Sequence, residues 1–137
     1  MRTDTFRLIV LLCFIVQGLL ACTSPAVPEG TVYEVLSPGE FEMKMSEKAA
    51  YQLIDVRTPG ELKKGYLSGT GNYDYRADEI AKAVEELDKE KPVFVYCGSG
   101  IRSRKSATIL MKAGFKEIYD MKGGMKAWLA AGKAVVK

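Results

Sequence analysis

From residue 31 onward, short apolar runs alternate with stretches in which apolar residues recur every three or four positions. The first pattern predicts buried strands and the second predicts amphipathic helices. The expected strands are residues 31–36, 51–57, 93–96 and 115–121, with room for a further short strand in the loop over 65–75. The expected helices are residues 38–47, a short helix from 59, and residues 78–87, 103–113 and 125–131. This alternation predicts an α/β fold of three layers, in which a mostly parallel central sheet is covered by helices on both faces.

Two tetrapeptides of the form Ser/Thr-Pro-Gly-Glu mark the beginning of two of these helices. They are Ser37-Pro38-Gly39-Glu40 and Thr58-Pro59-Gly60-Glu61. In each, the hydroxyl residue is placed to cap the helix, proline suits the first helical position, and glutamate can bond back to the cap. The second tetrapeptide follows the charged residues Asp55 and Arg57 at the end of a strand. We expect Asp55 and Arg57 to form a structural ion pair, joined by Glu61, rather than to act in catalysis.

The strand at 93–96 is followed by a cysteine and a glycine-rich segment. The segment is Cys97-Gly98-Ser99-Gly100-Ile101-Arg102-Ser103. Glycines let backbone amides turn inward, and inward amides at a helix N-terminus stabilise a thiolate or a bound anion. Arg102 adds a permanent positive charge. We interpret Cys97 as a nucleophile beside an anion site. A buried structural cysteine is the alternative, but it would need neither the flexible loop nor the charge.

The composition of the chain excludes several types of catalytic and metal site for Cys97. The length of 137 residues suits one domain, and a hydrophobic fraction of 47% is enough for a packed core. The formal net charge of +3 gives no indication of a nucleic-acid partner. The chain contains no histidine, which excludes Ser-His-Asp and Cys-His catalysis and any histidine-ligated metal. None of the three cysteines forms a Cys-x-x-Cys pair, so we expect neither a zinc site nor a dithiol redox site, and no cofactor.

The first 21 residues have the pattern of a secretion signal. Arg2 and Arg7 give a positively charged start, and residues 8–16 form an uninterrupted apolar run. The run leads into Leu19-Leu20-Ala21-Cys22, which resembles the lipobox of bacterial lipoproteins. The resemblance implies that the chain is cut before Cys22 and that Cys22 receives a diacylglyceryl group. A plain signal peptide cut near Ala21 and an uncleaved anchor are the alternatives.

This interpretation divides the chain into three parts. Residues 1–21 are the signal peptide, residues 22–30 a lipid-anchored tether rich in proline and small residues, and residues 31–137 the folded domain. The mature protein would be extracytoplasmic and attached to a bacterial membrane through Cys22, on the periplasmic side where two membranes are present. Cys97 would then be its only free thiol, and we expect the protein to be a monomer.

Four separate motifs of the folded domain resemble the single-domain rhodaneses, a family of sulfurtransferases. In chain order they are Leu53-Ile54-Asp55-Val56-Arg57-Thr58-Pro59 with Glu61, Gly65-Tyr66-Leu67-Ser68-Gly69 with Asn72, the segment from Val95 to Ser103, and Gly123-Gly124 with Trp128. The second motif departs from the family's usual Gly-His-Ile-Pro-Gly, because Tyr66 replaces the histidine and Ser68 the proline. That histidine is not the family's nucleophile, so the departure concerns contacts at the edge of the site rather than the chemistry.

The resemblance implies a sulfur-transfer reaction at Cys97. In the family, a cysteine in this place takes a sulfane sulfur from a small anionic donor such as thiosulfate, holds it as a persulfide and passes it to a thiol or to cyanide. The implied substrate-binding residues are Gly98, Ser99, Gly100, Ile101, Arg102 and Ser103. Four residues separate Cys97 from Arg102, the shorter loop that the family associates with sulfur transfer, whereas its phosphatase-like relatives have one more. A persulfide carrier without turnover, and a phosphatase or arsenate reductase of the same fold, are the alternatives.

Overall fold

The structure is a computed structural model, and it describes residues 26–137. The predicted signal peptide and the predicted lipidation site at Cys22 lie outside these residues. The strands are β1 (Val32–Leu36), β2 (Gln52–Asp55), β3 (Gly71–Asn72), β4 (Val93–Tyr96) and β5 (Glu117–Met121). The helices are α1 (Pro38–Glu47), α2 (Pro59–Leu62), α3 (Ile80–Glu86), α4 (Ile101–Lys112) and α5 (Gly124–Ala130), with a 3-10 turn, η2, at Tyr75–Ala77. Among residues 26–137, no helix combines the length and the apolar character that crossing a membrane requires.

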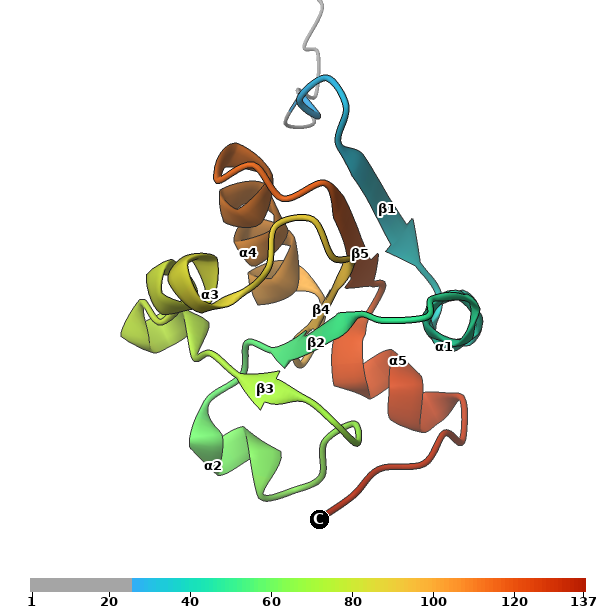
Figure 1. The fold of residues 1–137 in the computed structure, drawn as a ribbon. Coiled ribbons are helices and arrows are strands. Elements are labelled where there is room, and N and C mark those ends of the chain that lie inside the picture. Colours follow the sequence, from blue (N-terminus) through green and yellow to red (C-terminus); the bar gives the residue numbers. More distant parts are fainter. Residues whose placement is uncertain (1–25) are drawn as a thin grey trace, which may run out of the picture.

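The strands form one sheet in the order β1-β5-β4-β2-β3, and every neighbouring pair is parallel (Figure 1). The predicted α/β fold with a parallel sheet is therefore confirmed. Because parallel strands all end at the same edge, the segments that follow β2, β4 and β5 meet at one end of the molecule. Figure 1 shows α2, α5 and the C-terminus at this end and the start of β1 at the other.

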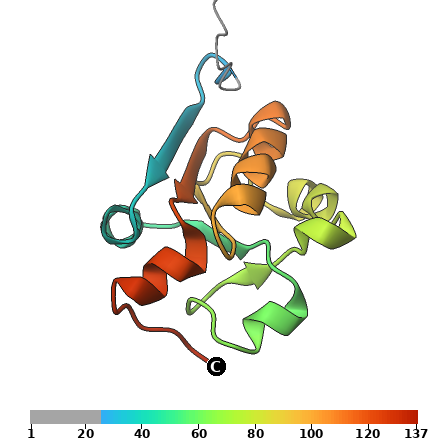
Figure 2. The ribbon, with the colours of Figure 1, turned by 180° about the vertical axis from the view of Figure 1, so that it is seen from behind.

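The residues of β4 alternate between two hydrophobic clusters, one on each face of the sheet. Val93 and Val95 pack in the cluster formed with α3 and α4. Phe94 and Tyr96 pack in the other cluster, which includes Phe41 of α1 and residues of α5. Figure 2 shows the two pairs of helices on opposite sides of the sheet. Since β4 is buried on both faces, its sequence is apolar throughout rather than alternating.

Three helices begin at residues other than those predicted, and α5 differs by one residue, since it begins at Gly124 rather than at 125. Helix α4 begins at Ile101 rather than at 103, because Gly100 adopts the left-handed conformation, with a φ of 92°, and serves as its N-cap. Helix α3 begins at Ile80 rather than at 78, because η2 intervenes and Asp78 ends that turn with a φ of 58°. The side chain of Ile101 is 66% exposed, so the first turn of α4 lies outside the apolar periodicity of the rest of the helix.

Candidate active site

Cys97 directly follows β4, the middle strand of the sheet, and its side chain is buried. Its Sγ accepts a hydrogen bond from the backbone N–H of Gly100, with 3.1 Å between sulfur and nitrogen. Gly100 is also the N-cap of α4, so the sulfur lies beside the N-terminus of a 12-residue helix. The free N–H groups and the dipole at a helix N-terminus favour negative charge, and the same position therefore stabilises a thiolate or a persulfide anion. We call residues 97–102 the Cys97 loop.

The turn from β5 into α5 holds the Cys97 loop from one side. The N–H groups of Met125 and Lys126 donate to the carbonyl oxygens of Cys97 and Gly98 at 2.8 and 3.0 Å. Gly124 has a φ of 56°, and a Cβ atom at this position would lie 2.3 Å from the Cys97 carbonyl oxygen. Only glycine fits so close an approach in this conformation. Gly124 therefore both begins α5 and contacts the Cys97 loop.

Arg102, in the first turn of α4, is held by a carboxylate from α2. Its Nη1 and Nη2 donate to Oε2 and Oε1 of Glu61 at 2.8 and 2.6 Å, an ion pair that spans 41 positions of sequence. Hydrogen bonds from Arg102 and then from Thr58 lower the pKa of Glu61 to about 2, although burial acts the other way. The bond to Glu61 also raises the pKa of Arg102. Both groups are therefore charged at neutral pH, and the guanidinium is fixed beside the Cys97 loop.

Asp55 and Arg57 form a buried ion pair, but Glu61 does not join it through its carboxylate, contrary to the prediction. The Nε and Nη2 of Arg57 donate to Oδ2 of Asp55 at 2.9 and 2.6 Å. Nη2 also donates to the carbonyl oxygen of Gly65 at 2.8 Å, and Nη1 reaches only the backbone carbonyl of Glu61, at 3.3 Å. The carboxylate of Glu61 binds the guanidinium of Arg102 instead.

The remaining predicted substrate-binding residues differ in exposure. Ser99 and Ile101 are exposed, whereas Gly98 and Gly100 are half-buried. Ser103 is buried, and its hydroxyl has no hydrogen-bond partner within the described part of the chain. The structure thus brings the predicted residues together after β4, but Ser103 lies in the interior rather than at the surface of the site.

Asp120 of β5 is a buried carboxylate that the sequence-based interpretation missed. Its Oδ2 accepts a hydrogen bond from the Tyr33 hydroxyl at 3.3 Å, and its Oδ1 has no partner among the residues that the structure describes. Burial raises the pKa of Asp120 to about 6, although nearby Ser103, Tyr33 and Arg104 act in the opposite direction. The one signal available in the sequence is a charged residue that interrupts the apolar residues over 118–121.

A hollow of about 280 Å³ lies beside the Cys97 loop, on the side of β5. Its lining comprises Ser99, Gly100, Ile101, Arg104, Lys105, Asp120, Met121, Lys122 and Gly123. The lining therefore combines three cationic side chains with one buried carboxylate. Among residues 26–137, no three Cys, Asp or Glu side chains are grouped closely enough to hold a metal ion.

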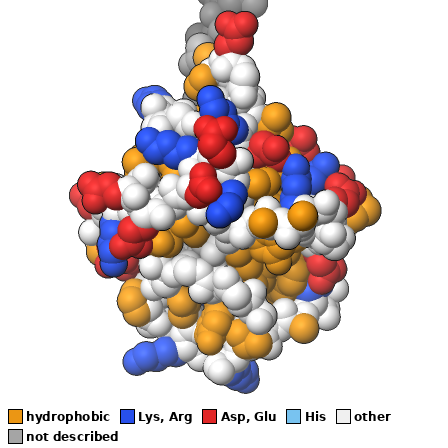
Figure 3. All heavy atoms as spheres, in the orientation of Figure 1, with side chains coloured by type: hydrophobic (Ala, Val, Ile, Leu, Met, Phe, Trp, Pro, Cys, Tyr) orange, Lys and Arg blue, Asp and Glu red, His pale blue; other side chains and the backbone are white. Residues whose placement is uncertain are grey.

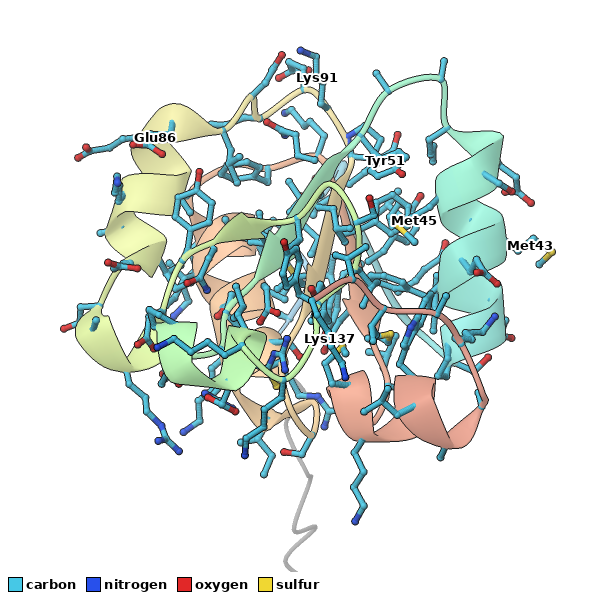
Figure 4. All side chains as sticks on the ribbon, turned by 90° about the horizontal axis from the view of Figure 1, so that it is seen from below. Met43, Met45, Tyr51, Glu86, Lys91 and Lys137 are labelled. Carbon is cyan, nitrogen blue, oxygen red and sulfur yellow. The ribbon has the colours of Figure 1, made fainter. Side chains whose placement is uncertain are left out.

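The C-terminal segment is tied to the loop that follows α2. Tyr66, which stands where the rhodanese motif has histidine, exchanges two backbone hydrogen bonds with Val136, at 3.0 and 2.9 Å. Figure 4, a view from the end that holds α2 and α5, shows Lys137 between these two helices. The last residues therefore lie at the same end of the molecule as the Cys97 loop.

Comparison with known proteins assigns the chain to a family. Residues 37–131 match the family model of the rhodanese-like domain. The uncharacterized protein YqhL of Bacillus subtilis is 40% identical over 77 residues, which are 56% of this chain and 60% of that protein. The thiosulfate sulfurtransferase GlpE of Shewanella oneidensis is 29% identical over 86 residues, 63% of this chain and 83% of that protein. The crystal structure of a rhodanese-related protein from Thermoplasma volcanium has a TM-score of 0.67 at 28% identity, over 76% of this chain and 98% of that one. This chain belongs to the family of rhodanese-like domain proteins.

Proposed function

We propose that the protein is a sulfurtransferase that moves a sulfane sulfur from a small anionic donor such as thiosulfate to a thiophilic acceptor, through a persulfide on Cys97. The observation that carries the proposal is the hydrogen bond from the Gly100 N–H to Cys97 Sγ at the N-terminus of α4. Membership of the family and the likeness to a thiosulfate sulfurtransferase support it. Since the chain has no histidine to act as a base, the proposal assigns stabilisation of the thiolate to the Gly100 N–H and the N-terminus of α4.

The reaction has two steps. In the first, the Cys97 thiolate attacks the outer sulfur of thiosulfate, the S–S bond of the donor breaks, and sulfite leaves with the bonding electrons. A persulfide anion remains on Cys97. In the second, cyanide or a thiolate attacks the terminal sulfur, and the bond to Cys97 Sγ breaks, which regenerates the thiolate and releases thiocyanate or a hydropersulfide. The chemistry balances because each bond formed to the transferred sulfur replaces one that breaks.

Arg102 and Glu61 have separate roles in this scheme. Two of the five N–H donors of Arg102 bind Glu61, and the others are available to the oxygens of a sulfonate group. Glu61 does not touch the reacting sulfur. It acts as a positioning residue, because it holds the guanidinium beside the Cys97 loop.

The experiment that tests the proposal replaces the sulfur nucleophile. Cys97→Ser should abolish thiocyanate formation from thiosulfate and cyanide, since the serine hydroxyl is not ionised at neutral pH and forms no persulfide. The variant should unfold at nearly the same temperature as the wild type, because serine is similar in size. Thiocyanate formation by a folded Cys97→Ser protein would remove the mechanism.

Two further measurements separate this function from the alternatives. With excess thiosulfate and cyanide, the wild-type protein should form many thiocyanate molecules per chain, whereas a carrier without turnover would form one. Hydrolysis of an aryl phosphate should be negligible, because the span of four residues between Cys97 and Arg102 leaves little room for a tetrahedral phosphoryl group. Efficient phosphate hydrolysis would favour a phosphatase instead.

Attachment to a membrane through Cys22 is a second, separate part of the proposal. Its support is the sequence Leu19-Leu20-Ala21-Cys22, which follows an apolar run over residues 8–16. Mass spectrometry of the native protein should show a chain that begins at Cys22 and carries the mass of a diacylglyceryl group. Cys22→Ala should remain uncleaved or be mislocalised. A soluble chain that begins at another residue would contradict lipidation.

A further inference from the structure

The surface around the Cys97 loop is strongly basic. Six exposed cationic side chains lie there, and we call them the basic rim: Lys63, Lys64, Arg104, Lys105, Lys122 and Lys126. They come from the residues just after α2, the first two turns of α4, the turn that precedes α5 and the first turn of α5. In Figure 3, the lowest part of the molecule, where α2 and α5 lie, shows Lys and Arg side chains and no acidic ones.

Some lysines at the opposite end of the molecule are paired with carboxylates, although Lys89, Lys112 and Lys116 are not paired within the described residues. Lys48 pairs with Glu117, Lys82 with Glu86, and Lys91 with Asp88. Within residues 26–137, by contrast, no side chain of the basic rim has a carboxylate oxygen within 4.0 Å of its nitrogen atoms. All six side chains of the basic rim are therefore unpaired in the described part of the chain, whereas the lysines at the other end are paired in part.

The carboxylates of the elements around the basic rim are engaged elsewhere. Glu61 binds Arg102, and the pKa of Glu40 is lowered first by its hydrogen bonds to Ser37 and to a smaller extent by the charge of Lys122. Asp120 is buried beneath the hollow that Arg104 helps to line. The charge of the basic rim is thus available to an incoming molecule.

Two large apolar side chains are exposed on α4 and α5, the helices whose first residues contain or contact the Cys97 loop. Ile101 is 66% exposed and lines the hollow of about 280 Å³ beside the loop, and Leu129 of α5 is 53% exposed. Helical spacing places Ile101 on one face with Lys105 and Leu129 on one face with Lys126. A protein docked on the basic rim could bury both of these side chains. A donor as small and polar as thiosulfate requires neither of them.

We propose that the basic rim docks an acidic polypeptide that presents its own cysteine to Cys97, so that the sulfur acceptor is a protein thiol with acidic surroundings. The inference rests on the proposed sulfur transfer and names its acceptor class. Arg104, Lys105 and Lys122 line the hollow beside the loop that would hold the transferable sulfur. Neither an anionic membrane nor an ordinary nucleic acid carries a thiol to receive that sulfur. The acceptor thiolate attacks the terminal sulfur, the bond to Cys97 breaks, and the acceptor becomes a hydropersulfide without any added oxidant.

The test measures the second half-reaction alone. The protein is loaded with thiosulfate, freed of excess donor, and mixed with one of two end-blocked synthetic peptides, in which a single cysteine is flanked by aspartates or by lysines. Rates are compared at equal thiolate concentration. At low ionic strength the acidic peptide should react about 10-fold faster or more, and this advantage should disappear near 0.5 M salt, as expected for roughly complete screening of surface charge.

Two matched triple variants test whether the preference for the acidic peptide depends on the basic rim. Lys105→Glu, Lys122→Glu and Lys126→Glu together should abolish or reverse the preference for the acidic peptide. Lys89→Glu, Lys112→Glu and Lys116→Glu change the net charge equally at the opposite end of the sheet and should preserve the preference. Equal effects of the two triple variants would overturn the proposal, since the position of the charge would then be irrelevant.

The remaining outcomes also decide the question. If loaded wild-type protein passes sulfur to cyanide but treats both peptides alike, the acidic acceptor is excluded and the sulfurtransferase function stands. If no sulfur reaches cyanide, both proposals fail. An RNA oligonucleotide or a phosphatidylglycerol vesicle that binds the basic rim and that the acidic peptide cannot displace would overturn the assignment to a protein partner.

Discussion

The two Ser/Thr-Pro-Gly-Glu turns have the same local structure and different functions. Each forms a complete capping box at the start of a helix, α1 in one case and α2 in the other. In the first, Oε2 of Glu40 accepts the N–H of Ser37 at 2.8 Å, and its hydrogen bonds stay within the turn. In the second, Oε2 of Glu61 accepts the N–H of Thr58 at 3.1 Å, and both of its oxygens also bind Arg102.

The difference between these turns shows that the motif determines the local fold and its surroundings determine its role. Both turns follow a parallel strand, so both lie at the carboxyl edge of the sheet. Only the second lies next to the Cys97 loop, because β2 pairs with β4 whereas β1 pairs with β5 at the edge of the sheet. A carboxylate that would otherwise only cap a helix thereby positions a guanidinium at the site.

Removal of the Glu61 carboxylate is expected to have the largest effect. Glu61→Ala leaves Arg102 without its ion pair, and we expect kcat/KM for thiosulfate to fall about 100-fold, or about 2.7 kcal/mol. Glu40→Ala removes the same residue from the equivalent turn and should change kcat/KM by less than about twofold, since its contacts end within the cap. Steady-state formation of thiocyanate measures both. Equal losses would show that the two turns do not differ in function.

Asp120 is a third carboxylate to compare with Glu40 and Glu61. Within the residues that the structure describes, it neither caps a helix nor forms an ion pair. Its pKa is raised from 3.8 to about 6, so the folded protein holds this proton more tightly than the unfolded chain. Stability should therefore fall as pH rises from about 4 to 6, and the ionised group should cost about 2 to 3 kcal/mol above that range. Asp120→Asn should be more stable than the wild type by about 2 kcal/mol at pH 7.5.

Urea unfolding at two pH values checks this prediction. The gain in stability should nearly vanish near pH 3.5, because the carboxyl group is then protonated in the folded protein and largely protonated in the unfolded protein. A gain of equal size at both pH values would mean that it does not arise from ionisation. A loss of stability at pH 7.5 would mean that Asp120 has a partner that favours its charge.

The geometry of the Arg102 side chain is tested by a substitution that keeps its charge. Arg102→Lys retains the positive charge but loses the planar fork that binds both oxygens of Glu61, and kcat/KM for thiosulfate should fall by about 10-fold. Arg104→Lys, an equivalent change at an exposed position two residues later, serves as the control and should have almost no effect. Wild-type rates in Arg102→Lys would show that charge alone is sufficient.

The smallest effects should come from the caps themselves. Ser37→Ala and Thr58→Ala each remove a side-chain acceptor at a helix start, and each should lower the free energy of unfolding by about 1 kcal/mol. Only Thr58→Ala should also lower sulfur transfer, by about two- to threefold, because Thr58 helps to orient Glu61. Urea unfolding measures the change in stability, and the rate of thiocyanate formation measures the change in sulfur transfer. An equal loss of activity in Ser37→Ala would remove the distinction.

Most of the helices and strands could be predicted from local sequence patterns. Ser37 and Thr58 cap α1 and α2, as the two Ser/Thr-Pro-Gly-Glu tetrapeptides predict. The apolar run of β4 forms the middle strand of the sheet. The start of α4 was placed two residues late, because the left-handed backbone of Gly100 is a property of conformation that composition does not fix.

The candidate site was predictable only in part. The position of Cys97 at the end of a buried strand could be inferred, because it depends on residues that are adjacent in the sequence. The pairing of Glu61 with Arg102 could not, because it joins residues 41 positions apart and depends on which strands are neighbours in the sheet. Asp120 was missed for a related reason: its burial depends on the packing of β1 and α4 against β5, which no local pattern reports.

The parallel sheet has a practical consequence for how this protein can be handled. The described chain enters β1 at the end of the molecule opposite to the Cys97 loop, whereas Val136 pairs with Tyr66 and Lys137 lies between α2 and α5 (Figure 1). An affinity tag, a fluorophore or a solid support joined ahead of Ala26 would leave the sulfur-bearing end facing the solvent. The same addition after Lys137 would begin beside that end and obstruct it.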